Sequence, residues 1–302
     1  MAALLLAPLG MLYGASVAWK ARHTLSAQIA ARVICIGNLT AGGSGKTPVA
    51  LAIGARVQAK GKRIFFLTRG YGGSEAGPLR VTAQNTVQQV GDEALLLAAV
   101  APTIVARDRA AGAALAVAEG AEVIVMDDGH QNFGLTKDLS LVVVDGEAGF
   151  GNGLMIPAGP LREPVAQGLS RADAVIVMNG RVPDLAAYRG PVLQARLAVS
   201  GDMFARQRVF AFAGIGRPEK FVTSLKEAGA VVTGSRFFPD HHPFQPGEID
   251  ALKASAAGVQ LVTTQKDFVR LTAQDRKDVA VLPVEAHFAD TVALDALLAR
   301  LA

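Results

Sequence analysis

The chain has 302 residues, of which 51% are hydrophobic and 19% are charged, and its formal net charge is +4. This length allows two domains, and the composition is typical of a globular protein rather than a disordered one. Because the positive charge is small and no long lysine and arginine block occurs, nucleic-acid binding has little support, and a polyanionic small substrate or an anionic membrane suits the chain better.

The first predicted element is an apolar helix at the amino terminus. Residues 1–19 carry no charged side chain, and Lys20 and Arg22 follow directly. A cleaved signal peptide is disfavoured because no basic start precedes the stretch, and a spanning helix because the stretch is short and interrupted by proline and glycine. The pattern favours a helix over residues 1–22 that dips into one membrane leaflet, with Trp19 near the headgroups. An apolar helix packed on the protein itself is the alternative.

Beyond residue 31 the chain alternates short apolar runs with helical stretches, which is typical of strand-helix-strand units and a mainly parallel, buried sheet. The predicted strands are 33–36, 63–67, 103–105, 123–126, 141–144 and 174–177, and the predicted crossover helices are 48–60, 92–99 and 109–119. Cys35 is the only cysteine, so no internal disulfide or cysteine-based zinc cluster is possible. Its place in the first strand indicates a buried small hydrophobe.

The pattern changes after residue 190. The sequence predicts an extended segment at 192–197, a strand at 208–213, a helix at 218–228, strands at 259–263 and 279–283, and a closing helix at 292–302. We therefore expect a domain boundary near residue 200, with a smaller carboxy-terminal α/β domain over residues 201–302.

The strongest chemical signal lies between the first predicted strand and the first predicted crossover helix. The glycines there let backbone amides converge on an anion, and the amino terminus of the next helix adds partial positive charge. Lys46 would reach the terminal phosphates of ATP, and the Thr47 hydroxyl would complete a Mg²⁺ shell. The segment departs from the pattern G-x-x-x-x-G-K-[ST] at Thr40, where the pattern has glycine. The predicted nucleotide-binding residues are Thr40, Ala41, Gly42, Gly43, Ser44, Gly45, Lys46 and Thr47.

A pair of aspartates, Asp127 and Asp128, follows the strand predicted at 123–126. Adjacent carboxylates repel each other unless a cation lies beside them, so this pair at the carboxyl end of a strand indicates a Mg²⁺ site. A solvated turn with a capping aspartate is the alternative.

Phosphoryl transfer also uses a base that accepts the proton of the attacking hydroxyl. Asp92 is one candidate, although its place at the start of a predicted helix suits a simple amino-terminal cap equally. His241 and His242 lie in a turn-rich stretch where an imidazole would act beside a carboxylate, and surface loop histidines are the plainer interpretation.

Several short segments together resemble the tetraacyldisaccharide 4'-kinases, the lipid A 4'-kinases of Gram-negative bacteria. The segments read Gly-Asn-Leu-Thr-Ala-Gly-Gly-Ser-Gly-Lys-Thr-Pro at 37–48, Thr-Arg-Gly-Tyr-Gly-Gly at 68–73, Val-Gly-Asp-Glu at 90–93, Asp-Asp-Gly-His-Gln at 127–131, Pro-Ala-Gly-Pro-Leu-Arg-Glu-Pro at 157–164, Phe-Pro-Asp-His at 238–241 and Thr-Thr-Gln-Lys-Asp at 263–267. The resemblance extends from the apolar amino terminus to about residue 271.

This resemblance implies an ATP- and Mg²⁺-dependent kinase on the cytoplasmic face of the bacterial inner membrane. Such enzymes transfer the γ-phosphate of ATP to the 4'-hydroxyl of a tetraacylated diglucosamine 1-phosphate. The implied partners are this lipid and the membrane surface, with no nucleic acid and no obligate protein partner. The implied fold is a P-loop NTPase-like α/β/α domain over residues 23–200 and a smaller α/β/α domain over residues 201–302, in addition to the amino-terminal membrane-associated helix.

The resemblance also implies roles for individual residues. Lys46 and Thr47 would lie at the phosphates and the metal, with Asp127 and Asp128 near Mg²⁺. Asp92 would be the base, helped by His241, and Arg162 and Glu163 would lie close to the reacting groups. After the paired aspartates the family commonly reads Asp-Asp-Gly-Phe-Gln-His, whereas this chain has His130 and Asn132 in place of the phenylalanine and the last histidine. A role for that last imidazole is therefore not carried over.

The nearest rival interpretation is a membrane-tethered P-loop ATPase switch that positions a partner protein and transfers nothing. The best-known switches of this kind carry a lysine where this chain has Ala41. A GTPase is disfavoured because no Asn-Lys-x-Asp element follows a late strand, and a passive lipid-binding module leaves the paired aspartates unexplained.

Overall fold

The computed structural model describes residues 2–185, 188–199 and 201–301, and it divides into two compact units. The first unit contains Met1–Leu197 and Ala286–Ala302, and the second contains Ala198–Glu285. The first passage from one unit to the other, between Leu197 and Ala198, lies close to the domain boundary that the sequence places near residue 200. The last part of the chain differs from the sequence-based expectation, because residues 286–302 belong to the first unit and not to the carboxy-terminal one.

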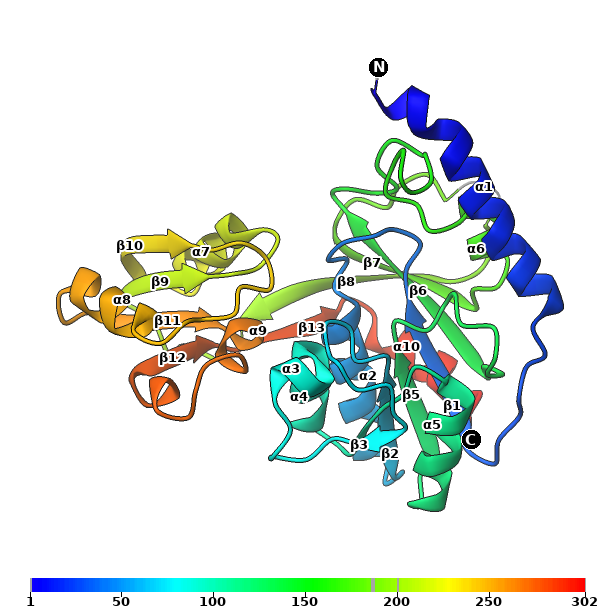
Figure 1. The fold of residues 1–302 in the computed structure, drawn as a ribbon, viewed down its shortest axis with the longest axis horizontal. Helices are drawn as coiled ribbons and strands as arrows, with labels where there is room; N and C mark the ends of the chain where they lie inside the picture. Colours follow the sequence, from blue (N-terminus) through cyan, green and yellow to red (C-terminus); the bar gives the residue numbers. More distant parts are fainter. Residues whose placement is uncertain (1, 186–187, 200, 302) are drawn as a thin grey trace. The chain divides into compact units, whose positions relative to one another are not determined.

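The first unit is built on a mainly parallel sheet (Figure 1). Its strands are β1 (Arg32–Gly37), β2 (Ile64–Thr68), β3 (Leu79–Arg80), β4 (Thr103–Val105), β5 (Val123–Asp127), β6 (Leu139–Gly146), β7 (Ala174–Gly180), β8 (Val192–Val199) and β13 (Val284–Phe288), in the order β13-β8-β7-β6-β1-β5-β2-β4-β3. The pairs from β8 through β4 are parallel, and the short β3 is antiparallel to β4. The mainly parallel α/β fold predicted from the sequence is therefore confirmed.

Helices cover both faces of this sheet. Side chains of α2 (Lys46–Ala59), α4 (Asp92–Ala98) and α10 (Thr291–Ala299) share one buried cluster with the strands, and α5 (Arg109–Ala118) and α6 (Val165–Leu169) contribute to clusters that contain the alternate strand residues. The short α3 (Val87–Val90) precedes α4. Because both faces are covered, the central strands are apolar throughout rather than alternating, as in the fully buried β2.

The assignment of residues 286–302 to the first unit has a simple cause. Strand β13 lies beside β8 at the edge of the large sheet, and α10 buries Leu294, Leu297 and Leu298 in the same cluster as the apolar face of α2. Each leucine buried in this way stabilises the first unit by about 1.5–3 kcal/mol.

The amino-terminal helix α1 (Ala2–His23) is present as predicted and packs against the loop that contains Met155. A Cβ added to Gly10 would lie 2.8 Å from the carbonyl oxygen of Met155, and one added to Gly14 would overlap the Met155 side chain. The helix also exposes large apolar side chains, namely Leu5, Leu9, Met11, Leu12 and Trp19. Among the described residues, none of the helices combines the length and the apolar character that crossing a bilayer requires.

The second unit holds a smaller, fully parallel sheet in the order β10-β9-β11-β12. Its strands are β9 (Arg208–Ala213), β10 (Val231–Phe237), β11 (Gln260–Thr264) and β12 (Val279–Leu282). Helix α7 (Pro218–Glu227) packs into one buried cluster with these strands, and α8 (Glu248–Ala256) packs into another with the alternate residues. The short helix α9 (Gln265–Phe268) and the 3₁₀ helix η1 (Asp275–Asp278) lie between β11 and β12 in the chain.

Candidate active site

The glycine loop connects β1 to α2, as the sequence predicts. Gly45 caps α2 in the left-handed region at φ 86°, and a Cβ there would also come within 3.2 Å of Met178, so only glycine fits well. The cap makes no side-chain hydrogen bond and the first turn of α2 holds no acidic residue, so the first amides of the helix remain available to an anion. The buried Asn38 braces the loop, since its Nδ2 donates to the Thr40 carbonyl at 2.6 Å and to the Ser44 hydroxyl at 3.0 Å.

Asp127 ends β5 and is paired in register with Ile36, just before the loop. The Thr47 hydroxyl donates to Asp127 Oδ2 at 2.9 Å, while Asp127 Oδ1 is buried and has no hydrogen-bond partner among the described residues. Burial raises the pKa of Asp127 to about 7, with Glu93 and Asp128 adding to the rise and Lys46 opposing it. A buried carboxylate oxygen without a partner is the feature that a bound cation would satisfy.

Asp128 differs from its neighbour because it is already paired with cations. Its backbone adopts the left-handed region at φ 52°, and its Oδ1 accepts from Arg162 Nη1 at 2.7 Å and lies 3.7 Å from Lys46 Nζ. Burial alone would raise the pKa of Asp128, but Lys46 and Arg162 outweigh it and hold that pKa below its ordinary value. Asp128 therefore gathers two cations beside the glycine loop.

Arg162 reaches this position because its segment lies alongside the glycine loop. The Arg162 amide donates to the Leu39 carbonyl at 2.8 Å, the Ala41 amide donates to the Pro160 carbonyl at 2.7 Å, and Thr40 and Leu161 form an antiparallel bridge. The neighbouring Glu163 directs its carboxylate elsewhere: it is 1% exposed and accepts from Arg171 Nη2 and Gln131 Nε2. Arg162 thus lies at the glycine loop, whereas the Glu163 carboxylate faces Arg171 rather than Asp128.

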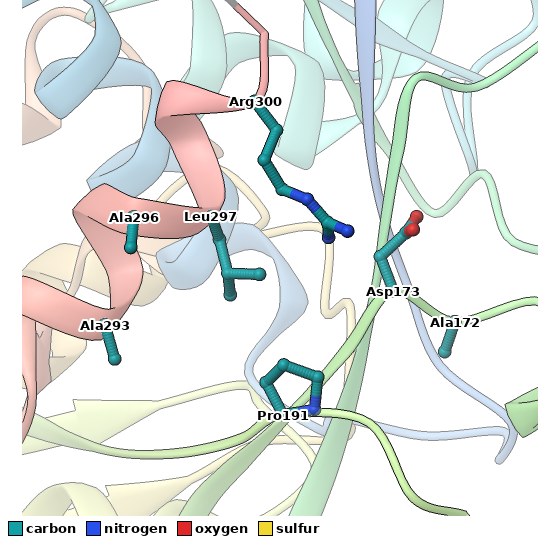
Figure 2. A pocket seen from close by; sticks show the side chains of 7 residues that line it. All are labelled: Ala172, Asp173, Pro191, Ala293, Ala296, Leu297 and Arg300. Carbon is teal, nitrogen blue, oxygen red and sulfur yellow. The ribbon is translucent and has the colours of Figure 1, made fainter.

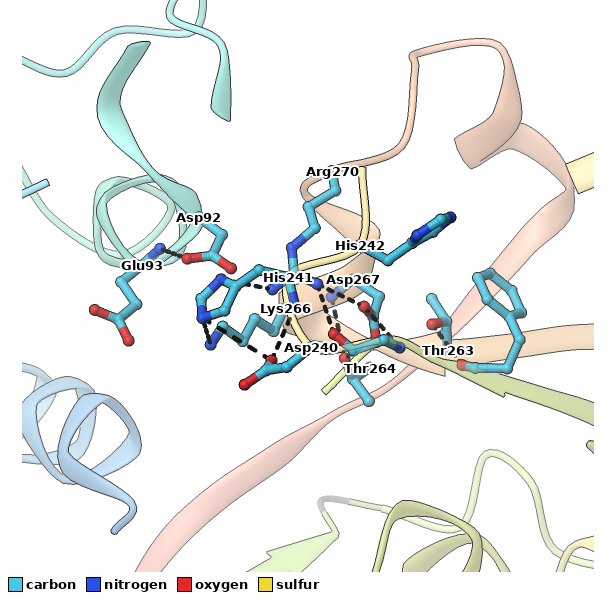
Figure 3. A network of polar contacts seen from close by, with 12 residues as sticks. Asp92, Glu93, Asp240, His241, His242, Thr263, Thr264, Lys266, Asp267 and Arg270 are labelled. Atoms are coloured by element: carbon cyan, nitrogen blue, oxygen red, sulfur yellow. Dashed lines mark hydrogen bonds and ion pairs between the residues drawn. The ribbon is translucent and has the colours of Figure 1, made fainter. Parts of the chain in front are cut away.

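Asp92 is the first residue of α4, and the cap of that helix is Gly91. The interpretation of Asp92 as the helix cap is therefore wrong. Its side chain is nearly buried, at 2% exposed, and its Oδ1 accepts from the Glu93 amide at 2.9 Å (Figure 3).

In the second unit, His241 lies beside two cationic side chains (Figure 3). Its Nε2 is 3.3 Å from Lys266 Nζ, and its Nδ1 is 3.4 Å from Arg270 Nη2. Arg270 is itself fixed by the buried Asp267, which accepts from Arg270 Nη1 at 2.9 Å and from the Gly214 amide at 3.1 Å. These contacts hold the His241 ring at the carboxyl end of the smaller sheet.

His242, the other candidate histidine, has a structural environment. Its Nε2 pairs with Glu248 Oε2 at 2.8 Å, and its ring stacks on Phe238 with the centroids 4.6 Å apart. These contacts favour His241 over His242 as the residue with a chemical role.

Two further residues near the site were given no role from the sequence. His130 is buried where its Cβ would overlap any side chain at Gly37, and its Nε2 lies 2.9 Å from the Gly168 carbonyl. Burial, together with the cations Arg171 and Lys137, lowers the pKa of His130 to about 3, so the ring is neutral. Arg109 is nearly buried, and burial lowers its pKa to about 10 against the opposing effect of Asp128. Arg109 follows the strand predicted at 103–105 and lies at the same edge of the sheet as Asp127. This position in the sequence could have identified Arg109 as a residue near the site.

A metal ion bound at this site would need water or substrate oxygens as ligands in addition to protein side chains. The described residues contain no group of three or more histidine, cysteine or acidic side chains arranged to hold a metal. Thr47 and Asp127 nevertheless fit Mg²⁺, which characteristically takes one or two carboxylates and completes its shell with water and substrate phosphates.

A separate groove of about 620 Å³ lies between α10 and the segments that flank β7 (Figure 2). It is lined by Ala172, Asp173, Pro191, Ala293, Ala296, Leu297 and Arg300. It contains none of the candidate catalytic or phosphate-binding residues, so the chemistry is assigned to the glycine loop and not to this groove.

Comparisons with known proteins identify the family of the whole chain. The family model described as LpxK, tetraacyldisaccharide-1-P 4'-kinase, matches residues 2–302. The tetraacyldisaccharide 4'-kinase of Rhodospirillum centenum is 52% identical, covering 96% of this chain and 91% of its own, and that of Paramagnetospirillum magneticum is 52% identical, covering 93% and 89%. A crystal structure of LpxK from Aquifex aeolicus, described as an "apo" form in complex with ATP, aligns with a TM-score of 0.83 at 26% identity and covers 100% of this chain and 99% of its own.

Proposed function

Because the chain belongs to the tetraacyldisaccharide-1-P 4'-kinase family, we propose that its glycine loop and the residues around it carry out the transfer that defines this family. The protein is a kinase of lipid A biosynthesis that transfers the γ-phosphate of ATP to the 4'-hydroxyl of a tetraacylated diglucosamine 1-phosphate. The rival interpretation as an ATPase switch is not kept, since curated relatives that span almost the whole chain are kinases.

One observation supports the assignment of the site above all others. Two cations, Lys46 and Arg162, meet at Asp128 directly beside the open amides of α2. We propose that these amides and Lys46 hold the terminal phosphates of ATP, while Arg162 stays against Asp128 and donates to the phosphoryl group in transfer. Phosphoryl transfer depends mainly on positioning and on neutralising the charge of the transition state, and this arrangement offers both.

We propose Thr47 and Asp127 as the residues that hold Mg²⁺. The partnerless Oδ1 of Asp127 supports this choice over Asp128, whose Oδ1 already faces two cations. When bound, Mg²⁺ would neutralise charge on the β- and γ-phosphate oxygens. Asp128 would contribute by keeping Lys46 and Arg162 in place.

We propose Asp92 as the base that accepts the proton of the 4'-hydroxyl, with His241 as its helper. The burial of Asp92 supports this role, since removal from water makes a carboxylate a stronger proton acceptor. Asp92 belongs to the first unit and His241 to the second, and the proposal that they cooperate rests on the family resemblance.

We propose that α1 attaches the enzyme to the cytoplasmic face of the inner membrane by entering one leaflet without spanning the bilayer. The exposed side chains of Leu5, Leu9, Met11 and Leu12 support this, because a group of apolar side chains exposed to water is more stable in contact with lipid. Lys20 and Arg22 follow at the end of the helix, where anionic headgroups would attract them.

The direct test is the mass of a lipid A precursor after incubation with the enzyme, ATP and Mg²⁺. We expect the precursor to gain one phosphoryl group with the wild-type protein, and no gain with Lys46→Ala. Asp92→Asn should also abolish transfer but leave the affinity for ATP near that of the wild type, because a base acts in the transition state more than in binding. Release of inorganic phosphate without a phosphorylated lipid, or unchanged turnover by Lys46→Ala, would refute the proposal.

A further inference from the structure

An ion pair next to the site, between the partly exposed Arg171 and the buried Glu163, has no part in the chemistry proposed above. Arg171, which follows α6, places its Nη2 2.6 Å and 2.8 Å from the two carboxylate oxygens of Glu163. Its Nη1 donates to the Gln167 carbonyl at 2.8 Å, and its guanidinium lies 5.2 Å from the ring centroid of Phe133. Arg171 is therefore held from several sides, and it holds a carboxylate that is only 1% exposed.

Glu163, which Arg171 holds in place, in turn fixes the side chain of Gln131. Gln131 Nε2 donates to Glu163 Oε1 at 2.8 Å and also to the Asn38 carbonyl at 2.9 Å, at the start of the glycine loop. The other end of the same amide, Gln131 Oε1, lies 3.5 Å from Arg162 Nη1. One glutamine thus touches the glycine loop, Glu163 and the guanidinium of Arg162.

Arg162 and Glu163 are neighbours whose side chains reach different partners. Arg162 contacts Asp128 beside Lys46, and Glu163 contacts Arg171 and Gln131. The backbone between them is tied to the loop by the bond from the Arg162 amide to the Leu39 carbonyl. A displacement of Glu163 would therefore move Arg162 as well.

We propose that Arg171 is a positioning residue for phosphoryl transfer, which acts through Glu163 and Gln131 to hold Arg162 against Asp128. Loss of Arg171 removes the guanidinium that holds both oxygens of a buried carboxylate, so Glu163 turns towards water. This displacement loosens Gln131 and the segment that carries Arg162. A misplacement of about 1 Å in a catalytic group can lower a rate by about 100-fold.

Steady-state kinetics with ATP and the lipid acceptor test this inference. We expect Arg171→Ala to lower kcat by about 10- to 100-fold, as is typical when the partner of a site residue is removed, and to change KM for ATP much less. Arg171→Lys should recover only part of kcat, because a lysine restores the charge beside Glu163 but cannot also reproduce the bond from Nη1 to the Gln167 carbonyl. Arg32→Ala is the matched control, since Arg32 also pairs with a carboxylate, that of Asp138 at 2.9 Å, but at the amino end of β1. That control should keep the wild-type kcat.

A double mutant distinguishes positioning from a general loss of stability. If Arg171 acts through Arg162, adding Arg171→Ala to Arg162→Ala should cause no further fall in kcat, whereas independent effects would multiply. Multiplying losses, or a wild-type kcat in Arg171→Ala, would overturn the inference. If Arg171→Ala does not fold, as judged by thermal unfolding, Arg171→Lys takes its place in the same comparison, and a wild-type kcat in that variant is equally contradictory.

The inference rests on the role proposed for Arg162, and the single variants separate the two. Full kcat in Arg162→Ala would refute the proposed role of Arg162 itself. A slow Arg162→Ala enzyme beside a fully active Arg171→Ala enzyme would refute only the positioning role of Arg171.

Discussion

The two adjacent aspartates at the end of β5 have opposite environments although they share one strand terminus. Asp128 lies between Lys46 and Arg162, which hold its pKa below the ordinary value, while burial raises the pKa of Asp127 to about 7. Burial is the main cause at Asp127, whose Oδ1 has no hydrogen-bond partner among the described residues, whereas Lys46 and Arg162 outweigh burial at Asp128. We infer that Asp127 is the metal ligand and that Asp128 holds the cationic side chains of Lys46 and Arg162 in place.

The first prediction concerns this division. Asp127→Asn should lower kcat by at least about 100-fold and raise the Mg²⁺ concentration needed for half-maximal activity, because it removes a charged ligand. Asp128→Asn should instead weaken ATP binding, because Lys46 and Arg162 lose the carboxylate that orients them. Titrations of Mg²⁺ and ATP on both variants check this, and equal effects of the two substitutions on Mg²⁺ dependence would contradict it.

The second prediction concerns the buried neutral ring of His130. Its pKa in the folded protein is about 3, against an ordinary value of 6.5, so below pH 6.5 the unfolded state binds a proton that the folded state does not. Stability contributed by the neutral ring is therefore complete above pH 6.5 and is lost as the pH falls towards 3. At pH 5 the loss amounts to about 2 kcal/mol, from about 1.4 kcal/mol for each pH unit.

Comparison with His130→Phe isolates this effect, because all other groups titrate in both proteins. Denaturant unfolding at pH 7 and pH 5 should give a larger fall in the free energy of unfolding for the wild type than for the variant. A fall of the same size in both proteins would show that His130 does not titrate on unfolding in this range.

At the scale of elements, α1 packs on the protein and also leaves large apolar side chains exposed. Gly10 and Gly14 let it approach the Met155 loop closely, while Leu9 and Leu12 remain exposed. A helix packed on the protein through small residues can still present an apolar surface to lipid. The exposed leucines, and not the glycines, are therefore the residues to test for membrane attachment.

The third prediction is that replacing Leu9 and Leu12 together with glutamate raises KM for vesicle-borne lipid by at least about 10-fold, because two apolar side chains no longer enter the bilayer. KM for ATP should stay unchanged. Val292→Glu, at a position on α10 that is 78% exposed, is the control for adding charge to an exposed apolar site. Equal increases in both KM values for the double variant would indicate a role of α1 in folding instead.

At the scale of the whole molecule, the chain leaves the first unit for the second and then returns to it. The returning residues supply α10, whose Leu297 is 7% exposed within the core shared with α2. The stability of the larger sheet thus depends on residues far away in the sequence.

The fourth prediction follows from this arrangement. Leu297→Ala should lower the free energy of unfolding by about 2–4 kcal/mol, because it opens a cavity in the core of the first unit. Hydrogen exchange should then accelerate in α2 and β7 but not in β9 of the second unit. Faster exchange confined to Ala198–Glu285 would contradict the assignment of α10 to the first unit.

Much of the fold was predictable because the signals are local. Apolar runs of four to eight residues mark the buried strands of a parallel sheet, and most predicted strands match the observed ones closely, as at 208–213 and β9. Strand β10 was missed because it lies at the edge of its sheet and contains Gly234 among polar and exposed residues. The short β3 and α6 were missed because two to five residues carry no readable period.

The sequence by itself determined the glycine loop, the paired aspartates and the family, because each of these depends on residues that are adjacent in the chain. Only the tertiary structure decided which aspartate lacks a partner, that Glu163 faces Arg171, and that the last helix completes the first unit. These features depend on contacts between segments distant in the sequence, and such contacts arise from packing the sheet edges and loops together, which no local pattern records.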